Sequence, residues 1–165
     1  MNVEIVDART KAEIVGNLIP LYIHDLSAFT DFDVEDDGTF RPPTSFAAYW
    51  EHADRHPFLL MADGKIAGFA LIRQMERAPL TFDMGEFFVL RRYRRLGVGR
   101  MAACALFNRF KGRWDVRELV ENLPAQSFWR RIIADYTGSD FEETRDYFER
   151  YKREFIVQRF RSRGA

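Results

Sequence analysis

The amino-acid sequence predicts one α/β domain spanning residues 1–165, with a β-sheet flanked by helices. The length lies within the usual range of about 100–200 residues for one domain, and hydrophobic residues make up 47% of the chain. Segments with apolar residues at strand spacing alternate with segments at helical spacing. An Asp-Gly turn between two strand-like segments makes at least part of the sheet antiparallel.

The first strand is expected at Val3–Val6, where apolar and charged residues alternate before Asp7. Residues 10–13 have the form of a capping box headed by Thr10, so we expect a helix to start there. Its apolar positions recur at helical spacing as far as Phe29, and Pro20 predicts a kink or a break into two pieces.

An acidic, turn-rich loop is expected at residues 30–43. Thr44 can cap a short second helix whose apolar positions lie on one face. Those positions are Phe46, Tyr49, Trp50 and Ala53.

Two antiparallel strands follow at 58–61 and 66–72, joined through Asp63 and Gly64. A longer strand is expected at 82–90. After it a basic, glycine-containing segment leads into a helix whose apolar face runs from Val98 to Phe110.

A second strand-to-helix unit is expected at 116–120, where the strand ends before Asn122 and Pro124 and a helix follows with apolar residues up to Ile133. In the tail, 155–158 is strand-like, whereas 141–153 fits a strand or a helix. We favour a terminal hairpin.

The charges of the two halves of the chain oppose each other. Residues 1–63 hold 12 acidic and 4 basic side chains, and residues 64–165 hold 13 and 21. This asymmetry suits a polyanionic cofactor on one side and a cationic acceptor near the aspartates of residues 31–37, although two solvated surfaces explain it as well. Nucleic acid is not expected as a partner, because the chain has no net basic charge.

No apolar run is long enough to span a membrane, so no membrane association is expected. The first residues are charged and do not resemble a signal peptide. Cys104 is the only cysteine, which rules out an internal disulfide or a thiolate metal cluster. We therefore expect a cytoplasmic protein.

The segment from Arg91 to Arg100 has the composition of an anion site. Glycines between a strand and a helix allow a tight turn, and the free N–H groups at the helix start attract phosphate. Five arginines accompany Gly97 and Gly99, and arginine donates paired hydrogen bonds to phosphate. A Walker A motif is absent. A Rossmann dinucleotide site, with Glu121 as its acidic residue, and a solvated arginine cluster both stay open as alternatives.

Arg94-Arg95-Leu96-Gly97-Val98-Gly99 resembles the [QR]-x-x-G-x-[GA] signature of the GNAT superfamily of acetyl-CoA-dependent N-acetyltransferases. The preceding residues 86–90 resemble the fourth strand of that family. Residues 122–125, with the aromatic pair at 128–129, resemble its second conserved block. The resemblance covers most of residues 3–134.

The resemblance implies a mixed, mostly antiparallel central sheet with a splayed cofactor notch between strands four and five. Backbone groups of Phe88 and Val89 would hydrogen-bond the pantetheine arm of acetyl-CoA. Asn122 would contact the cofactor from strand five. The pyrophosphate would bind at residues 94–100, which are Arg94, Arg95, Leu96, Gly97, Val98, Gly99 and Arg100.

Glu86 is the candidate general base, since many family members carry an acidic residue at this place and burial would raise its pKa. A purely structural carboxylate remains the alternative. The tyrosine that the family commonly uses as acid is replaced by Trp129, which cannot donate a proton to a thiolate. Tyr136 is a substitute to consider, although a structural role suits it better. Cys104 is not expected to be a nucleophile, and the histidines lack metal-ligand spacing, so no metal site is expected.

The function expected from the resemblance is direct transfer of an acetyl group from acetyl-CoA to an amine. The acceptor would be a small-molecule or peptide amine, and a homodimer is left open. A non-catalytic acyl-CoA-binding module is the alternative, and the missing tyrosine is its main support.

Overall fold

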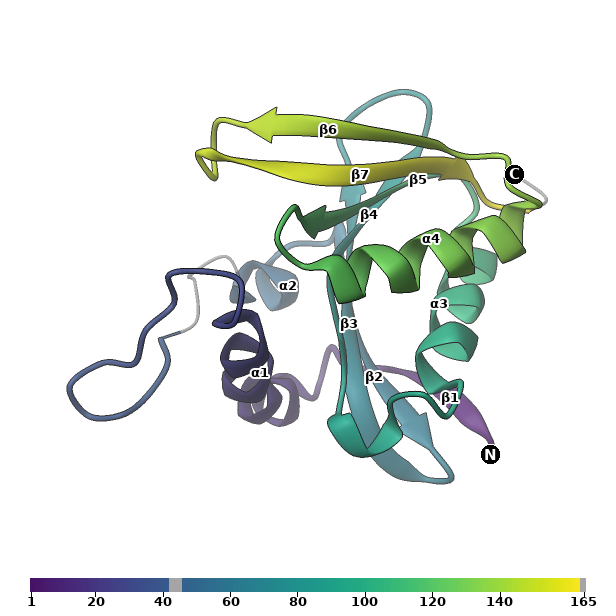
Figure 1. Cartoon of the computed structure of the whole chain (residues 1–165). Coiled ribbons are helices and arrows are strands. Elements are labelled where there is room, and N and C mark those ends of the chain that lie inside the picture. Colours follow the sequence, from purple (N-terminus) through teal and green to yellow (C-terminus); the bar gives the residue numbers. More distant parts are fainter. Residues whose placement is uncertain (42–45, 164–165) are drawn as a thin grey trace.

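Seven strands form one sheet in the order β1-β2-β3-β4-β5-β7-β6 in the computed structural model, which describes residues 1–41 and 46–163 (Figure 1). The strands are β1 (Val3–Asp7), β2 (Arg55–Ala62), β3 (Lys65–Met75), β4 (Thr81–Val89), β5 (Arg113–Leu119), β6 (Glu142–Phe148) and β7 (Arg153–Arg161). The helices are α1 (Ala12–Leu26), α2 (Ala48–Glu51), α3 (Val98–Arg109) and α4 (Leu123–Thr137), with a 3-10 turn at Arg91–Tyr93.

The fourth and fifth strands run parallel and separate along their length, whereas all other neighbours are antiparallel. Pairing between β4 and β5 extends only from Thr81 and Arg113 to Met84 and Val116. Beyond that point β4 stays paired with β3 and β5 stays paired with β7. The mixed, mostly antiparallel sheet is thus confirmed, and its two central strands diverge where the notch was expected.

Helices cover both faces of the sheet (Figure 1). On one face α1 and α2 pack on β3 and β4 through a cluster that includes Ile19, Ile23 and Phe69. On the other face α3 and α4 enclose the larger core, in which Phe107 and Trp114 are fully buried. Each helix buries one apolar stripe, as its sequence spacing predicts.

A bulge in β4 shapes the face beneath α1 and α2. Leu71 of β3 is opposite Glu86 and Ile72 is opposite Met84, so Gly85 is the extra residue. A Cβ atom on Gly85 would lie 2.0 Å from the Tyr49 hydroxyl oxygen, so only glycine fits at this position without a clash. The bulge leaves Asp83 and Glu86 on the same face of the sheet.

The first helix differs from its prediction. Lys11 is the N-cap and makes no side-chain cap bond, so the capping box headed by Thr10 is wrong. The helix also continues through Pro20 to Leu26 without a break and ends before Phe29. Ile19 and Ile23 are buried against the sheet on either side of the turn, and this packing outweighs the cost of proline in a helix.

The short second helix is confirmed, with Ala47 as its N-cap. The cap predicted at Thr44 lies outside the described residues. No helix or strand occurs in residues 30–41, as expected.

Both predicted hairpins are present. Asp63 and Gly64 have φ angles of 48° and 74°, as a type I′ turn requires. In the tail, β6 pairs with β7 over its whole length, so the hairpin is confirmed over the helical alternative. None of the described helices is long and apolar enough to cross a membrane.

Candidate active site

The glycine-containing segment ends at the N-terminus of α3, where backbone N–H groups are free. Gly97 is the N-cap, and its φ of +83° is a conformation that favours glycine. Met101 N–H donates to the Gly97 carbonyl at 3.0 Å. The N–H groups of residues 96–100 have no acceptor among the described residues. With the positive end of the helix dipole behind them, these groups are suited to binding an anion.

Three of the arginines beside this site already have partners. Arg100 lies 3.4 Å from Asp135, and the other two share one carboxylate. Arg94 Nε donates to the Val89 carbonyl at 2.7 Å, and its Nη2 donates to Asp25 on α1. Arg91 Nη2 donates to the same carboxylate at 2.8 Å. Burial raises the pKa of Asp25, but these hydrogen bonds hold that pKa below its ordinary value. Two guanidinium groups on one carboxylate leave a net positive charge next to the free N–H groups.

The edge of β4 beyond the bulge presents alternate residues to the diverging side. Leu90 N–H donates to the Ala67 carbonyl at 2.8 Å. Backbone groups of an antiparallel strand alternate in direction, so Phe88 also turns its N–H toward β3. The backbone N–H groups of Phe87 and Val89 therefore point away from β3, toward β5. Of the two residues predicted to contact the cofactor through their backbones, the register therefore favours Val89 and adds Phe87.

Asn122 caps α4. Its Oδ1 accepts the Ala125 N–H at 3.1 Å, and Pro124 follows in the first turn. Asn122 was predicted to contact the cofactor, and its side-chain oxygen is engaged in the protein itself.

Close packing joins α3 to α4 next to the anion site. A Cβ atom on Gly99 would lie 3.0 Å from the Phe128 ring, so the second glycine allows this approach. Trp129 is 5% exposed and packs edge-on against Phe87, with ring centroids 5.0 Å apart. It is a core residue.

Glu86 lies on the face beneath α1, where the Tyr22 hydroxyl donates to its carboxylate. Burial raises the pKa of Glu86 to about 7, against the opposing effect of the Tyr22 hydrogen bond. Burial and the Glu86 charge also raise the pKa of Tyr22 well above its ordinary value, so Tyr22 stays a donor. A carboxyl group with a pKa near neutrality suits proton transfer at physiological pH.

These features agree with a comparison of the sequence with protein families. The model of the acetyltransferase (GNAT) family matches residues 21–133. The chain belongs to the GNAT family. Membership supports acyl transfer to an amine as its reaction class. A comparison with curated protein sequences gives no match.

Solved structures of acetyltransferases share the fold. A protein from Desulfovibrio desulfuricans assigned to the family has a TM-score of 0.67 at 13% identity, covering 98% of this chain and 99% of its own. The ribosomal-protein-S18-alanine N-acetyltransferase from Escherichia coli has a TM-score of 0.60 at 19% identity, with 99% and 96% covered. An acetyltransferase from Bacillus subtilis in complex with CoA has a TM-score of 0.55 at 11% identity, with 72% and 84% covered.

The surroundings of Tyr136 and Cys104 indicate structural roles for both residues. The Tyr136 hydroxyl donates to Asn108 at 2.8 Å and accepts the Arg163 N–H at 3.1 Å, which ties α4 to α3 and the C-terminal strand. Burial raises the pKa of Cys104, which disfavours the thiolate that a nucleophile requires.

Sequence reasoning missed three groups beside Glu86. Tyr22 is 64 residues from Glu86 along the chain, and its place in an apolar helical stripe gave no sign of a polar role. Tyr49 lies against the bulge. Asp83 was assigned only to a strand, yet its carboxylate binds Arg73 and Arg117.

Proposed function

We propose that this chain is an acetyl-CoA-dependent N-acetyltransferase that transfers the acetyl group directly to an amine. The family match carries the proposal. The free N–H groups at the start of α3 support a polyanionic cosubstrate, and the half-buried Glu86 supplies a base. An acetyltransferase of similar fold was solved in complex with CoA.

In the proposed reaction Glu86 removes a proton from the protonated amine. The neutral nitrogen then bonds to the thioester carbonyl carbon and the carbon–sulfur bond breaks. The nitrogen loses its second proton to the CoA thiolate, which leaves as the thiol. Tyr22 orients the Glu86 carboxylate through its hydrogen bond. Trp129 has no acidic proton to offer, so the family's usual tyrosine donor has no counterpart at this position.

The cosubstrate would bind through residues 94–100 at the α3 N-terminus and through backbone groups of Phe87 and Val89. Asn122 would act by fixing the start of α4 next to the notch. We place the activity in the cytoplasm, a proposal supported by the single cysteine.

The test is acetyl-CoA consumption across a panel of amines, with release of free thiol as the readout. We expect turnover with at least one amine class. Acetyl-CoA binding without turnover on any amine would favour the alternative, a non-catalytic acyl-CoA-binding module, for which the buried Trp129 is the specific observation.

A further inference from the structure

A cluster of one buried acid and two arginines lies on the sheet face beside Glu86. The Asp83 side chain is 2% exposed. It accepts Arg73 Nη2 at 2.9 Å, and Arg117 donates to it through Nη2 at 2.8 Å and Nε at 3.1 Å. Because two guanidinium groups share one carboxylate, the cluster keeps one net positive charge.

These arginines still have unused donors. Arg73 Nε is buried and has no acceptor among the described residues. The Nη1 groups of Arg73 and Arg117 likewise make no hydrogen bond within the described part of the chain. A buried N–H group without an acceptor is unfavourable. The two Nη1 groups leave the cluster with donors for an oxyanion of a bound molecule.

The cluster forms the floor of a cavity of about 630 Å³, a size within the range of small-molecule sites. Its lining holds three aspartates and twice as many arginines, which are Arg73, Arg77, Arg117, Arg145, Arg150 and Arg159. The turn of the β6–β7 hairpin reaches over the side of the sheet that carries α2 (Figure 1). From it Phe148 packs against Arg117, whose guanidinium carbon lies 5.0 Å from the ring centroid.

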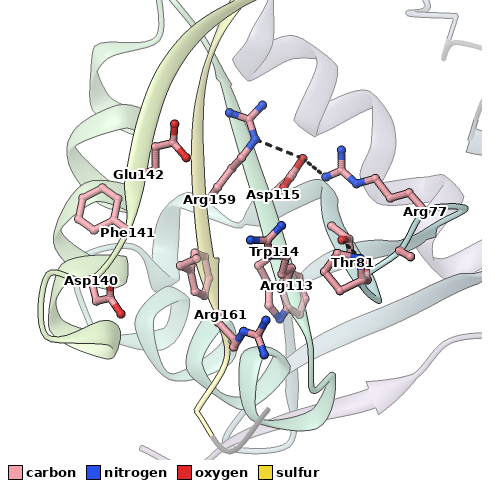
Figure 2. Close-up of a pocket in the computed structure, with 13 residues that line it drawn as sticks. Arg77, Thr81, Arg113, Trp114, Asp115, Asp140, Phe141, Glu142, Arg159 and Arg161 are labelled. Atoms are coloured by element: carbon pink, nitrogen blue, oxygen red, sulfur yellow. Dashed lines mark hydrogen bonds and ion pairs between the residues drawn. The ribbon is translucent and has the colours of Figure 1, made fainter.

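The other acids of the lining are already neutralised. Asp115 binds Arg77 at 2.6 Å and lies 3.8 Å from Arg159, as Figure 2 shows from the adjoining cavity. Arg159 also binds Asp146 at 2.6 Å. Arg150 forms no ion pair with any described residue. The excess charge of the cavity is therefore positive.

The cavity lies on the same face of β4 as the candidate base, although Glu86 is not among the residues that line it. Asp83, which does line it, and Glu86 lie on either side of the Gly85 bulge, and the charges of Asp83, Arg117 and Arg73 act on Glu86. An acceptor whose amine reaches Glu86 would therefore have the arginines near its other end.

We propose that the acceptor amine carries an oxyanion, a carboxylate or a phosphate, which binds Arg73 and Arg117 in this cavity. The inference rests on the proposed function, because it assigns the acceptor of the same reaction. Guanidinium groups bind both oxyanions through paired hydrogen bonds. The assignment differs from the purely cationic acceptor expected from the acidic residues near the N-terminus.

Three amines that share a two-carbon chain test the proposal: β-alanine, O-phosphoethanolamine and ethylamine. Their affinities for the parent protein are measured by calorimetry in the presence of CoA, and their acetylation is measured separately with acetyl-CoA. We expect at least one of the two anionic amines to bind about tenfold more tightly than ethylamine or better. The stronger of the two identifies carboxylate or phosphate. Equal binding of all three would overturn the proposal.

Variants then locate the oxyanion. Arg117→Lys keeps the charge but loses the paired donors, so it should weaken binding of the preferred anionic amine about tenfold and leave ethylamine unchanged. Arg150→Gln, at an exposed turn, should weaken binding of the same anionic amine less than Arg117→Lys does. The control is Arg113→Gln, since Arg113 lies on the same sheet outside this cavity. An equal loss in the control, or none in Arg117→Lys, would contradict the assignment. Binding of the anionic amines without acetylation would instead count against the proposed function.

Discussion

At the scale of single residues, the proposed reaction depends most on Glu86. Its carboxylate is removed from water by α1 and held by the Tyr22 hydroxyl. Burial has the larger effect, so its pKa rises to about 7. Above neutral pH the carboxyl group is therefore largely ionised, and in that form it can accept a proton from an amine.

We predict that Glu86→Gln lowers turnover by roughly 10²–10⁴, the usual contribution of a positioned base, and leaves acetyl-CoA affinity nearly unchanged. In the parent, activity requires the deprotonated carboxylate, so kcat/KM should rise with pH through about 7 and then level off. Steady-state kinetics between pH 5.5 and 9 measure both effects. Full activity of the variant at every pH would make Glu86 a structural residue.

Glu118 is a buried carboxyl group on the face of the sheet opposite to Glu86. Glu118 is 4% exposed. Neither of its carboxyl oxygens has a hydrogen-bond partner of normal geometry within the described residues. Burial raises the pKa of Glu118 to about 9, although Gln158 lies close enough to lower it somewhat. The folded protein therefore retains a proton here that the unfolded chain releases near the ordinary value of 4.5.

This difference makes stability depend on pH. The contribution of Glu118 is fully present below pH 4.5 and is lost as the pH rises toward 9. We predict that Glu118→Gln, which stays neutral, gains stability relative to the parent as the pH is raised from 5 to 9. Thermal unfolding across that range measures it, with the exposed Glu121→Gln as control. A constant difference between Glu118→Gln and the parent would contradict the prediction.

At the scale of elements, the proposed phosphate binding depends on the backbone conformation of the glycine-containing turn before α3. Gly97 has a positive φ and starts a helix whose first N–H groups are free. A carboxylate at this point would repel a phosphate and would strain the backbone. The two effects can be separated with a second glycine of similar conformation.

We predict that Gly97→Glu weakens acetyl-CoA binding at least tenfold, or about 1.4 kcal/mol. Gly38→Glu is the matched control, because Gly38 has a φ of +78° and lies in the acidic loop away from α3. It should leave the affinity unchanged. Calorimetry on the folded variants decides the matter. Equal affinities for Gly97→Glu and the parent would remove this turn from the cosubstrate site.

Elements specified by local signals could be predicted from the sequence. Asp63 and Gly64 define their hairpin because only a few residue pairs suit a type I′ turn, and alternation of apolar and charged residues identified β1. The continuity of α1 through Pro20 could not be predicted, since it depends on burial of Ile19 and Ile23 against strands far along the chain.

The candidate site divides in the same way. The turn before α3, which we propose binds the phosphates, lies in one short segment, so its backbone form could be predicted from its glycines. The pair of Tyr22 with Glu86 and the bonds from Arg91 and Arg94 to Asp25 join residues more than 60 positions apart. No local pattern marks such pairs, because the sheet brings them together only after folding. The assignment of residues 1–165 to one domain stays a prediction.

On the scale of the whole molecule, the diverging central strands divide the sheet into two parts. β1 to β4 form one part and β5 to β7 the other, and only four residues of β4 pair with β5. Beyond them the N–H groups of Phe87 and Val89 face away from β3. A ligand that lies along this edge would continue the sheet as an added strand and link the two parts.

We predict that CoA protects the amide hydrogens of Phe87 and Val89 from exchange with solvent, because the bound ligand would supply their missing acceptors. Phe88, which already faces β3, is the internal control and should change less. At a concentration of 100 times its Kd, CoA should also raise the free energy of unfolding by about 2.7 kcal/mol. Residue-resolved hydrogen exchange and thermal unfolding measure the two effects. Protection confined to residues 96–100 would mean that only the phosphates are bound and that the diverging edge of β4 takes no part.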